Sequence, residues 1–161
     1  MSRARPIDAI DHLIIHCSAS PNGRADTAAD IDQWHARNGW RRGAPHGGAN
    51  DLHHIGYHWV IELDGHVAAG RGLLETGAHA GPAMNGRSVG ICLIGTDRFT
   101  QAQWDQLACQ VRRLRDKLPG EVTIIGHRDV PANKRCPGFD VAGWLERGME
   151  PEPDQILEVA S

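Results

Sequence analysis

An almost uninterrupted apolar run, Ser-Val-Gly-Ile-Cys-Leu-Ile at residues 88–94, constrains the fold of this chain more than any other segment. A strand with one face in water alternates apolar and polar residues, whereas a run of this kind is typical of a strand covered on both faces. Such strands lie inside sheets that carry helices on each side. The rest of the chain should therefore supply further strands and the helices that cover them.

Other segments match the strand pattern. Residues 9–16, 56–63 and 121–126 are rich in apolar and β-branched side chains and end at turn signals. Asp64-Gly65 predicts a hairpin that leads from the second of these strands into residues 66–69. A hairpin pairs its strands antiparallel, so the predicted sheet is mixed.

Helix patterns alternate with these strands. Apolar residues recur at helical spacing over residues 28–35, after an N-cap expected at Asp26-Thr27. They recur again over residues 104–118, after a capping box formed by Thr100 and Gln103. Asp140 is expected to cap a short third helix. The alternation favours one α/β domain, a central mixed β-sheet flanked by helices.

Length and composition fit a single domain over residues 1–149, followed by an acidic, proline-containing tail over residues 150–161 that we expect to be frayed. The formal net charge of −3 lacks the basic footprint of a nucleic-acid binder. No apolar run approaches the length that crosses a bilayer, so we expect no membrane anchor. The N-terminus has no secretory signal pattern, so we expect synthesis in the cytoplasm. In that compartment the four cysteines need not pair, and Cys92 and Cys109 are interpreted as small buried hydrophobes.

The chain has ten histidines, and two of them close strands. His16 ends the first predicted strand and His127 ends the last, with Cys136 following in Lys-Arg-Cys-Pro-Gly. Two neutral imidazoles and a thiolate form a zinc-ligand set that leaves one tetrahedral position open for water. Cys17 is a less suitable ligand, because neighbours along a strand point to opposite faces. The spacing alone leaves structural roles for all of these residues open.

Several segments, taken together and in order, resemble the type 2 N-acetylmuramoyl-L-alanine amidases, a family that includes compact phage endolysins and the peptidoglycan recognition proteins. The similarity runs from about residue 10 to residue 144. Its segments are Ile-Ile-His-Cys-Ser-Ala-Ser (14–20), Gln-Trp-His-Ala-Arg-Asn-Gly-Trp (33–40), Gly-Tyr-His-Trp-Val-Ile (56–61), Gly-Ala-His-Ala (77–80), Ser-Val-Gly-Ile-Cys-Leu-Ile-Gly (88–95), and Gly-His-Arg-Asp (126–129) with Lys-Arg-Cys-Pro-Gly-Phe-Asp (134–140).

The resemblance implies an amidase-like fold and a set of site residues. It implies that zinc is held by His16, His127 and Cys136, the residues that match the family's ligands. Tyr57 and Lys134 match the two catalytic residues beside the metal-bound water, where either could relay a proton to the leaving nitrogen. His79 matches a histidine at the substrate groove, and we expect a substrate contact, with a structural hydrogen-bonding role as the alternative.

The same resemblance implies a monomeric zinc enzyme that cuts peptidoglycan between N-acetylmuramic acid and L-alanine. The first interpretation is a phage or prophage endolysin that reaches the cell wall after release from the cytoplasm. A cytosolic amidase that recycles soluble muropeptides is the second, although those enzymes typically carry Asp at the position of Cys136. A non-catalytic peptidoglycan-recognition module is the third, and such modules usually lack the cysteine.

The chain departs from the most compact relatives at residues 41–55, which separate Gly39-Trp40 from Gly-Tyr-His. A surface insertion of this length is tolerated at little free-energy cost. We expect it instead to form a longer wall of the peptide-binding groove near Tyr57.

Overall fold

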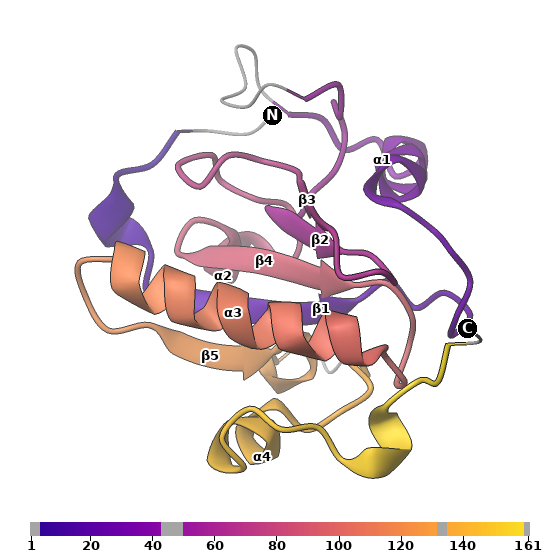
Figure 1. Ribbon diagram of the computed structural model, residues 1–161. Coiled ribbons are helices and arrows are strands. Elements are labelled where there is room, and N and C mark those ends of the chain that lie inside the picture. Colours follow the sequence, from indigo (N-terminus) through magenta and orange to yellow (C-terminus); the bar gives the residue numbers. More distant parts are fainter. Residues whose placement is uncertain (1–3, 43–49, 132–134, 160–161) are drawn as a thin grey trace.

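The computed structural model describes residues 4–42, 50–131 and 135–159. Its five strands form one sheet in the order β3-β2-β4-β1-β5 (Figure 1). The apolar run is β4 (Ser88–Leu93), which lies at the centre of the sheet with every residue buried. The prediction that this strand is covered on both faces is confirmed.

The sheet is mixed, as the hairpin predicted. Strand β1 (His12–Cys17) pairs in parallel with β4 and with β5 (Thr123–Gly126), and β2 (Trp59–Ile61) is parallel to β4. Only β3 (Val67–Ala69) is antiparallel, to β2. Because β1 and β5 are parallel neighbours, their carboxyl ends meet at one edge of the sheet.

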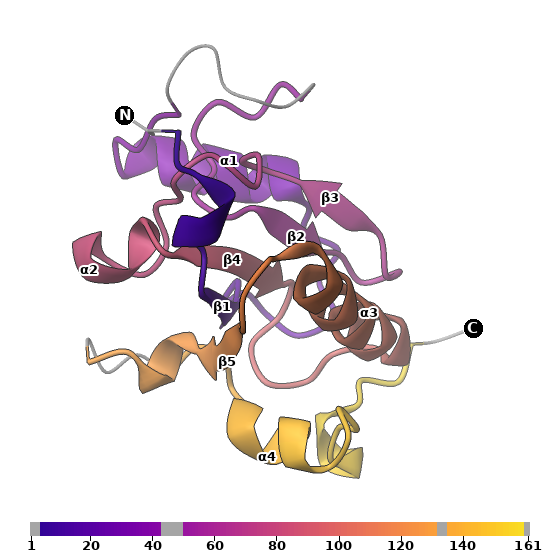
Figure 2. The ribbon, with the colours of Figure 1, turned by 90° about the vertical axis from the view of Figure 1, so that its left-hand side faces the viewer.

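Helices cover both faces of the sheet, with α3 on one side and α2 on the other (Figure 2). Helix α3 (Gln101–Lys117) begins at the predicted capping box, in which the Thr100 hydroxyl accepts from Gln103 N–H at 3.1 Å. Helix α1 (Ala28–Arg37) packs Ala28 and Ile31 on the second face, and α4 (Val141–Glu146) follows β5. The single turn of α2 (Pro82–Asn85) was not predicted, because it has no apolar stripe.

Alternation along β1 divides its side chains between the two faces. Leu13, Ile15 and Cys17 pack in the cluster that includes Trp104 of α3. The intervening Ile14 lies in a separate cluster. His16 has the same parity as Ile14, so its side chain lies on the face opposite α3.

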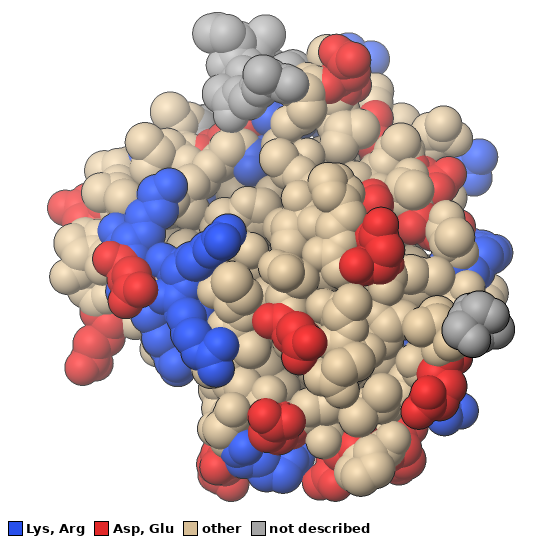
Figure 3. Space-filling model, in the orientation of Figure 1, with Lys and Arg blue, Asp and Glu red and all other residues tan. Residues whose placement is uncertain are grey.

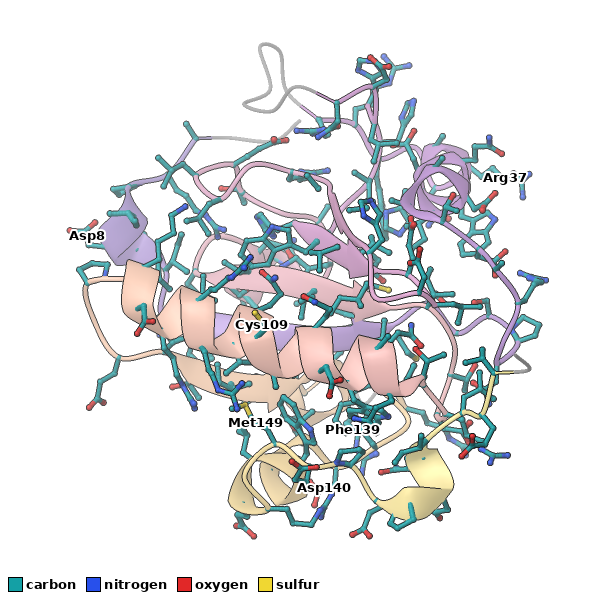
Figure 4. All side chains as sticks on the ribbon, in the orientation of Figure 1. Asp8, Arg37, Cys109, Phe139, Asp140 and Met149 are labelled. Atoms are coloured by element: carbon teal, nitrogen blue, oxygen red, sulfur yellow. The ribbon has the colours of Figure 1, made fainter. Side chains whose placement is uncertain are left out.

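Beneath α3, the four largest fully buried side chains lie together, and Phe139 meets Trp104 edge-on with ring centroids 4.7 Å apart. Figure 4 shows Phe139 and Asp140 below α3, where the chain enters α4. Removing an aromatic side chain from such a core costs about 3–5 kcal/mol. The members are Phe99, Trp104, Phe139 and Trp144.

The C-terminal segment is held against this core, so the expectation of a frayed tail is wrong for its described part. Ile156 pairs with Phe99 in a β-bridge, and Leu157 N–H donates to the Phe99 carbonyl at 2.8 Å. The Trp104 indole N–H donates to the Gln155 carbonyl at 3.0 Å. Composition alone predicted fraying, because acidic and proline residues carry no sign of such tertiary hydrogen bonds.

The outer face of α3 is polar and its second half is basic. Figure 3 shows these Lys and Arg side chains gathered over that end of the helix. They are Arg112, Arg113, Arg115 and Lys117, all exposed. Within the described residues, no helix combines the length and apolarity needed to cross a membrane.

Candidate metal centre

The three predicted ligands meet at the edge where β1 and β5 end. Ile15 pairs with Gly126, so the next residues of the two strands, His16 and His127, lie side by side with ring centroids 4.5 Å apart. The ligand atoms of His16, His127 and Cys136 all lie within 4.8 Å of one another. Two nitrogens and a sulfur at this spacing fit the donor set that Zn²⁺ prefers.

Short hydrogen bonds fix the segment that carries His127. Gly126 N–H donates to the Asp129 carboxylate at 2.9 Å and closes a 3₁₀ turn over His127–Asp129. Arg128 N–H then donates to the Cys136 carbonyl at 2.7 Å. The turn therefore brings the second imidazole and the cysteine to the same place.

The environment of the Cys136 sulfur is determined largely by Cys17, at the end of β1. Cys17 N–H donates to the Cys136 sulfur at 3.0 Å, which favours a thiolate. A side-chain hydrogen bond with Cys17, followed by burial, raises the pKa of the Cys136 thiol in the metal-free protein. A bound metal would displace that proton, as it does at other thiolate sites. Cys17 itself is buried in the α3-side core and does not belong to the ligand cluster.

His16 is buried and neutral. Burial, and then the nearby His127, lower its pKa well below the usual 6.5, and the neutral imidazole is the form that binds a metal. One ring nitrogen, Nε2, lies 2.8 Å from Nδ1 of His79. The other nitrogen, Nδ1, is left for a metal.

Tyr57 lies beside the cluster, with its ring centroid 4.9 Å from that of His16. Burial raises the pKa of the Tyr57 hydroxyl well above 10, so the group stays protonated and can donate a hydrogen bond. Cys92, the residue that pairs with His16 across β1 and β4, lies close enough to the Tyr57 hydroxyl to contribute to its raised pKa. Cys92 is buried as predicted, but no sequence pattern indicated this contact.

The remaining predicted site residues differ in how far the structure describes them. Lys134 lies outside the described residues. His79 is only 8% exposed and joins His16 by the hydrogen bond above. His79 therefore borders the metal cluster from inside the protein.

A hollow of about 680 Å³ lies between the end of α1 and the segment around α2. Its lining includes Trp40, Arg41, Arg71 and Ala78, and Ala78 precedes His79. The Arg71 side chain is buried, and its guanidinium donates to the Ile55 and Thr76 carbonyls at 2.7 and 2.8 Å. The Arg41 side chain is exposed.

A row of aromatic and imidazole rings in edge-on or tilted contact connects this hollow to the metal cluster. The Trp40 ring meets the His35 ring edge-on, with centroids 4.5 Å apart, and the His35 centroid lies 5.2 Å from that of Tyr57, which contacts His16. His35 also accepts a hydrogen bond from Gly56 N–H at 2.8 Å through Nδ1. Sequence periodicity assigned His35 to the buried face of α1 but could not reveal these contacts.

The insertion begins at the rim of the hollow with Arg41. The next residue, Arg42, is buried and pairs with the Glu75 carboxylate at 2.9 Å. Arg42 also donates to Asn50 and to the Leu52 carbonyl, at 2.8 and 2.6 Å. Both ends of the insertion are therefore fixed to the body of the domain, while residues 43–49 lie outside the described part.

The sequence is similar to one family of enzymes and to a phage protein. The family described as N-acetylmuramoyl-L-alanine amidase matches residues 5–139. An endolysin of Enterobacteria phage T3 is 34% identical over 151 residues, which cover 89% of this chain and 90% of that protein.

Comparison of the fold agrees with the sequence. The amidase LysC of Clostridium intestinale superposes with a TM-score of 0.71 at 26% identity, over 91% of each chain. The Drosophila peptidoglycan recognition protein PGRP-LB gives a TM-score of 0.69 at 27% identity, over 89% of this chain and 84% of its own.

Proposed function

Because the chain belongs to the type 2 N-acetylmuramoyl-L-alanine amidase family, we propose that it is a zinc-dependent endolysin that cuts the amide bond between N-acetylmuramic acid and the L-alanine of peptidoglycan. The observation that carries this proposal is the convergence of His16, His127 and Cys136 within 4.8 Å. The phage T3 relative supports the endolysin role, because it is named as an endolysin and matches along nearly its whole length.

The donor set fits zinc, which when bound would act as a Lewis acid and lower the pKa of a coordinated water to about 7. His16 contributes a neutral imidazole, and Cys136 receives a backbone N–H that stabilises its charged form. Together with His127, these residues would hold the ion without filling its coordination shell. A three-ligand site of this type leaves room for a reacting group.

Tyr57 is the described residue best placed to stabilise charge on the amide oxygen. Its hydroxyl stays protonated, and its ring lies against His16. A donor fixed before the reaction stabilises developing charge without reorganising, and losing one costs about 10²–10³ in kcat. We assign Tyr57 this role by residue type and position.

A proton must also reach the alanine nitrogen as the amide bond breaks, because an amine anion is a poor leaving group. Lys134 matches the family's catalytic lysine in sequence, and we assign the proton relay to Lys134 or Tyr57. If Lys134 takes part, either by relaying the proton or by stabilising charge, a Lys134→Met variant should retain zinc but lose turnover.

The hollow beside the cluster is the proposed site for the stem peptide. Trp40 offers an apolar surface at its wall, and the exposed Arg41 offers a positive charge to the carboxylates that make peptidoglycan anionic. Arg71 is buried in the wall of the hollow, bonded to backbone carbonyls and 4.0 Å from the Glu75 carboxylate, so it fixes the shape of the wall. This combination suits a peptide that carries carboxylates close to the bond that is cut.

The test is digestion of purified sacculi followed by mass spectrometry of the released fragments. Zinc-loaded protein, chelated protein and a Cys136→Ser variant are compared, with Cys109→Ser on α3 as the matched control. Free stem peptides that begin with alanine are expected from the loaded wild type and from Cys109→Ser alone. If loaded wild type releases no peptide from sacculi but cleaves soluble muropeptides, the protein is a recycling amidase. No cleavage of either substrate would indicate a recognition module.

A further inference from the structure

A chain of hydrogen bonds leads from His16 into the interior of the protein. His16 Nε2 lies 2.8 Å from His79 Nδ1, His79 Nε2 lies 3.3 Å from Ser88 Oγ, and Ser88 Oγ donates to the Met84 carbonyl at 2.7 Å. His79 is 8% exposed and Ser88 is fully buried. These hydrogen-bonded side chains therefore lie away from bulk water, and their donors and acceptors must be satisfied by one another.

The direction of every bond follows from the last one. A carbonyl oxygen can only accept, so the single hydroxyl hydrogen of Ser88 is committed to Met84. Ser88 Oγ is then an acceptor towards His79, whose Nε2 must carry the hydrogen. A neutral imidazole has one N–H, so His79 Nδ1 is an acceptor and His16 Nε2 must donate to it.

We propose that His79 and Ser88 form a positioning relay that holds the His16 ring in its Nε2–H tautomer and turns its Nδ1 lone pair towards the metal. The proposal rests on the proposed function in that it takes His16 as a metal ligand. Ligating histidines commonly donate their second N–H to a fixed acceptor, and loss of that acceptor typically weakens metal binding about 10–100-fold. The usual acceptor is a carboxylate or a carbonyl, and here it is a second histidine.

The protein encloses His79 closely enough to fix its orientation. A Cβ on Gly90 would lie 2.7 Å from the His79 ring, and one on Gly77 would lie 2.6 Å from it. The side-chain oxygen of Asn85 accepts from the backbone N–H groups of His79 and Ala80 at 3.0 and 2.9 Å. The ring thus lies in a slot between two glycines, on a backbone segment that is itself anchored. This rigidity suits a residue that orients a ligand.

The first test reads the tautomers directly in metal-free protein. Long-range ¹H–¹⁵N correlation spectra of histidine-labelled protein distinguish Nδ1–H from Nε2–H rings, and single-histidine variants assign the signals. Both His16 and His79 are expected as Nε2–H tautomers. An Nδ1–H tautomer on His79 would overturn the relay. This result does not depend on zinc or on activity, so it stays informative if the proposed function fails.

The second test measures zinc affinity by competition with a chelator. His79→Ala is expected to weaken binding by about 10–100-fold. His79→Asn is expected to recover most of the loss, because its side-chain oxygen lies near the position of Nδ1 and accepts the same hydrogen. Ser88→Ala should weaken binding less, since it removes only the group that orients His79.

Controls separate positioning from misfolding. Ser20→Ala changes another buried serine and should leave zinc affinity unchanged. Circular dichroism and thermal melts of the metal-free variants show whether each one folds. Wild-type zinc affinity in folded His79→Ala would refute the relay, and so would equal losses in His79→Ala and His79→Asn. Absence of zinc binding by the wild type would instead refute the proposed function.

Discussion

The backbone N–H of Cys17 donates to the sulfur of Cys136 at 3.0 Å, although 119 positions separate the two residues in the sequence. The bond comes from the main chain of β1, so it places the ligand sulfur at the end of the strand that carries His16. This contact therefore needs the main chain of Cys17 and not its side chain.

Cys17→Ala should retain zinc at full stoichiometry, because the backbone N–H that donates to the Cys136 sulfur does not need the Cys17 side chain. The side-chain hydrogen bond that the variant loses raises the pKa of Cys136, so its loss does not disfavour the thiolate. Its stability should fall by about 1 kcal/mol, since the variant loses one buried atom from the core. Cys136→Ser should lose most of its zinc, because it replaces the ligand itself. Metal analysis by mass spectrometry and urea unfolding measure the two effects. Equal zinc loss in both variants would mean that Cys17 also ligates.

Tyr57→Phe should lower kcat by about 10²–10³ while zinc content stays at the wild-type level. The variant removes the hydroxyl that remains protonated beside His16 and leaves the ring in place. Cys92→Ala tests the contact behind it, and we expect a smaller loss of kcat because only the orientation of the hydroxyl changes. Turnover of a soluble muropeptide and zinc content are measured in the same samples, so that a loss of kcat can be separated from a loss of metal. Unchanged kcat in Tyr57→Phe would remove Tyr57 from the mechanism.

The strands and the longer helices could be predicted because the patterns that define them lie within short, continuous segments of the sequence. The apolar run at 88–94 predicts a buried strand, and most of it forms β4. The capping box of Thr100 and Gln103 predicts a helix start, and α3 begins there. The ligand triplet depended on the family resemblance, because His16, His127 and Cys136 match no short metal motif. The mixed α/β fold and the family assignment are both confirmed.

The contacts that refine the site are not local, and this is why the sequence did not reveal them. His79 meets His16 across 63 positions, and Cys92 meets Tyr57 only after β4 has paired with its neighbours. His35 fits an apolar helix stripe whether or not an aromatic row passes through it. Donor and acceptor roles in the relay follow from the hydrogen bond of Ser88 to the Met84 carbonyl. This bond is local, but it depends on the α2 turn that contains Met84, and no apolar pattern predicts that turn.

Stability of the metal-free protein should fall as the pH falls below about 6.5, because several histidines are buried in the neutral form. Burial lowers the pKa of His58 to about 3 and that of His35 to about 4, from an ordinary value of 6.5. The unfolded chain binds these protons near pH 6 and the folded chain does not, so the free energy of unfolding falls as protons are added. Each such group contributes at most about 1.4 kcal/mol per pH unit.

Urea unfolding of chelated protein between about pH 7 and pH 5 measures this slope. Ring signals of His58 and His35, followed by NMR over the same range, should show no titration while the protein stays folded. A free energy of unfolding that is flat over this range, or a His58 ring that titrates near 6.5, would contradict the prediction.

Replacing residues 43–49 with a short glycine linker should weaken turnover of peptidoglycan fragments with long stem peptides more than turnover of short ones. The reason is that the insertion starts at Arg41 on the rim of the hollow, next to Trp40. The replacement must spare Arg42 and Asn50, because Arg42 is buried against Glu75 and bonded to Asn50. Losing a buried ion-pair partner costs about 3–5 kcal/mol, which would confuse folding with substrate binding.

KM and kcat are measured on muropeptides of increasing length, with Arg41→Ala as a companion that changes only the rim charge. Equal kcat/KM values for the deletion and the wild type on every length would show that the insertion is a surface loop without a role in the groove.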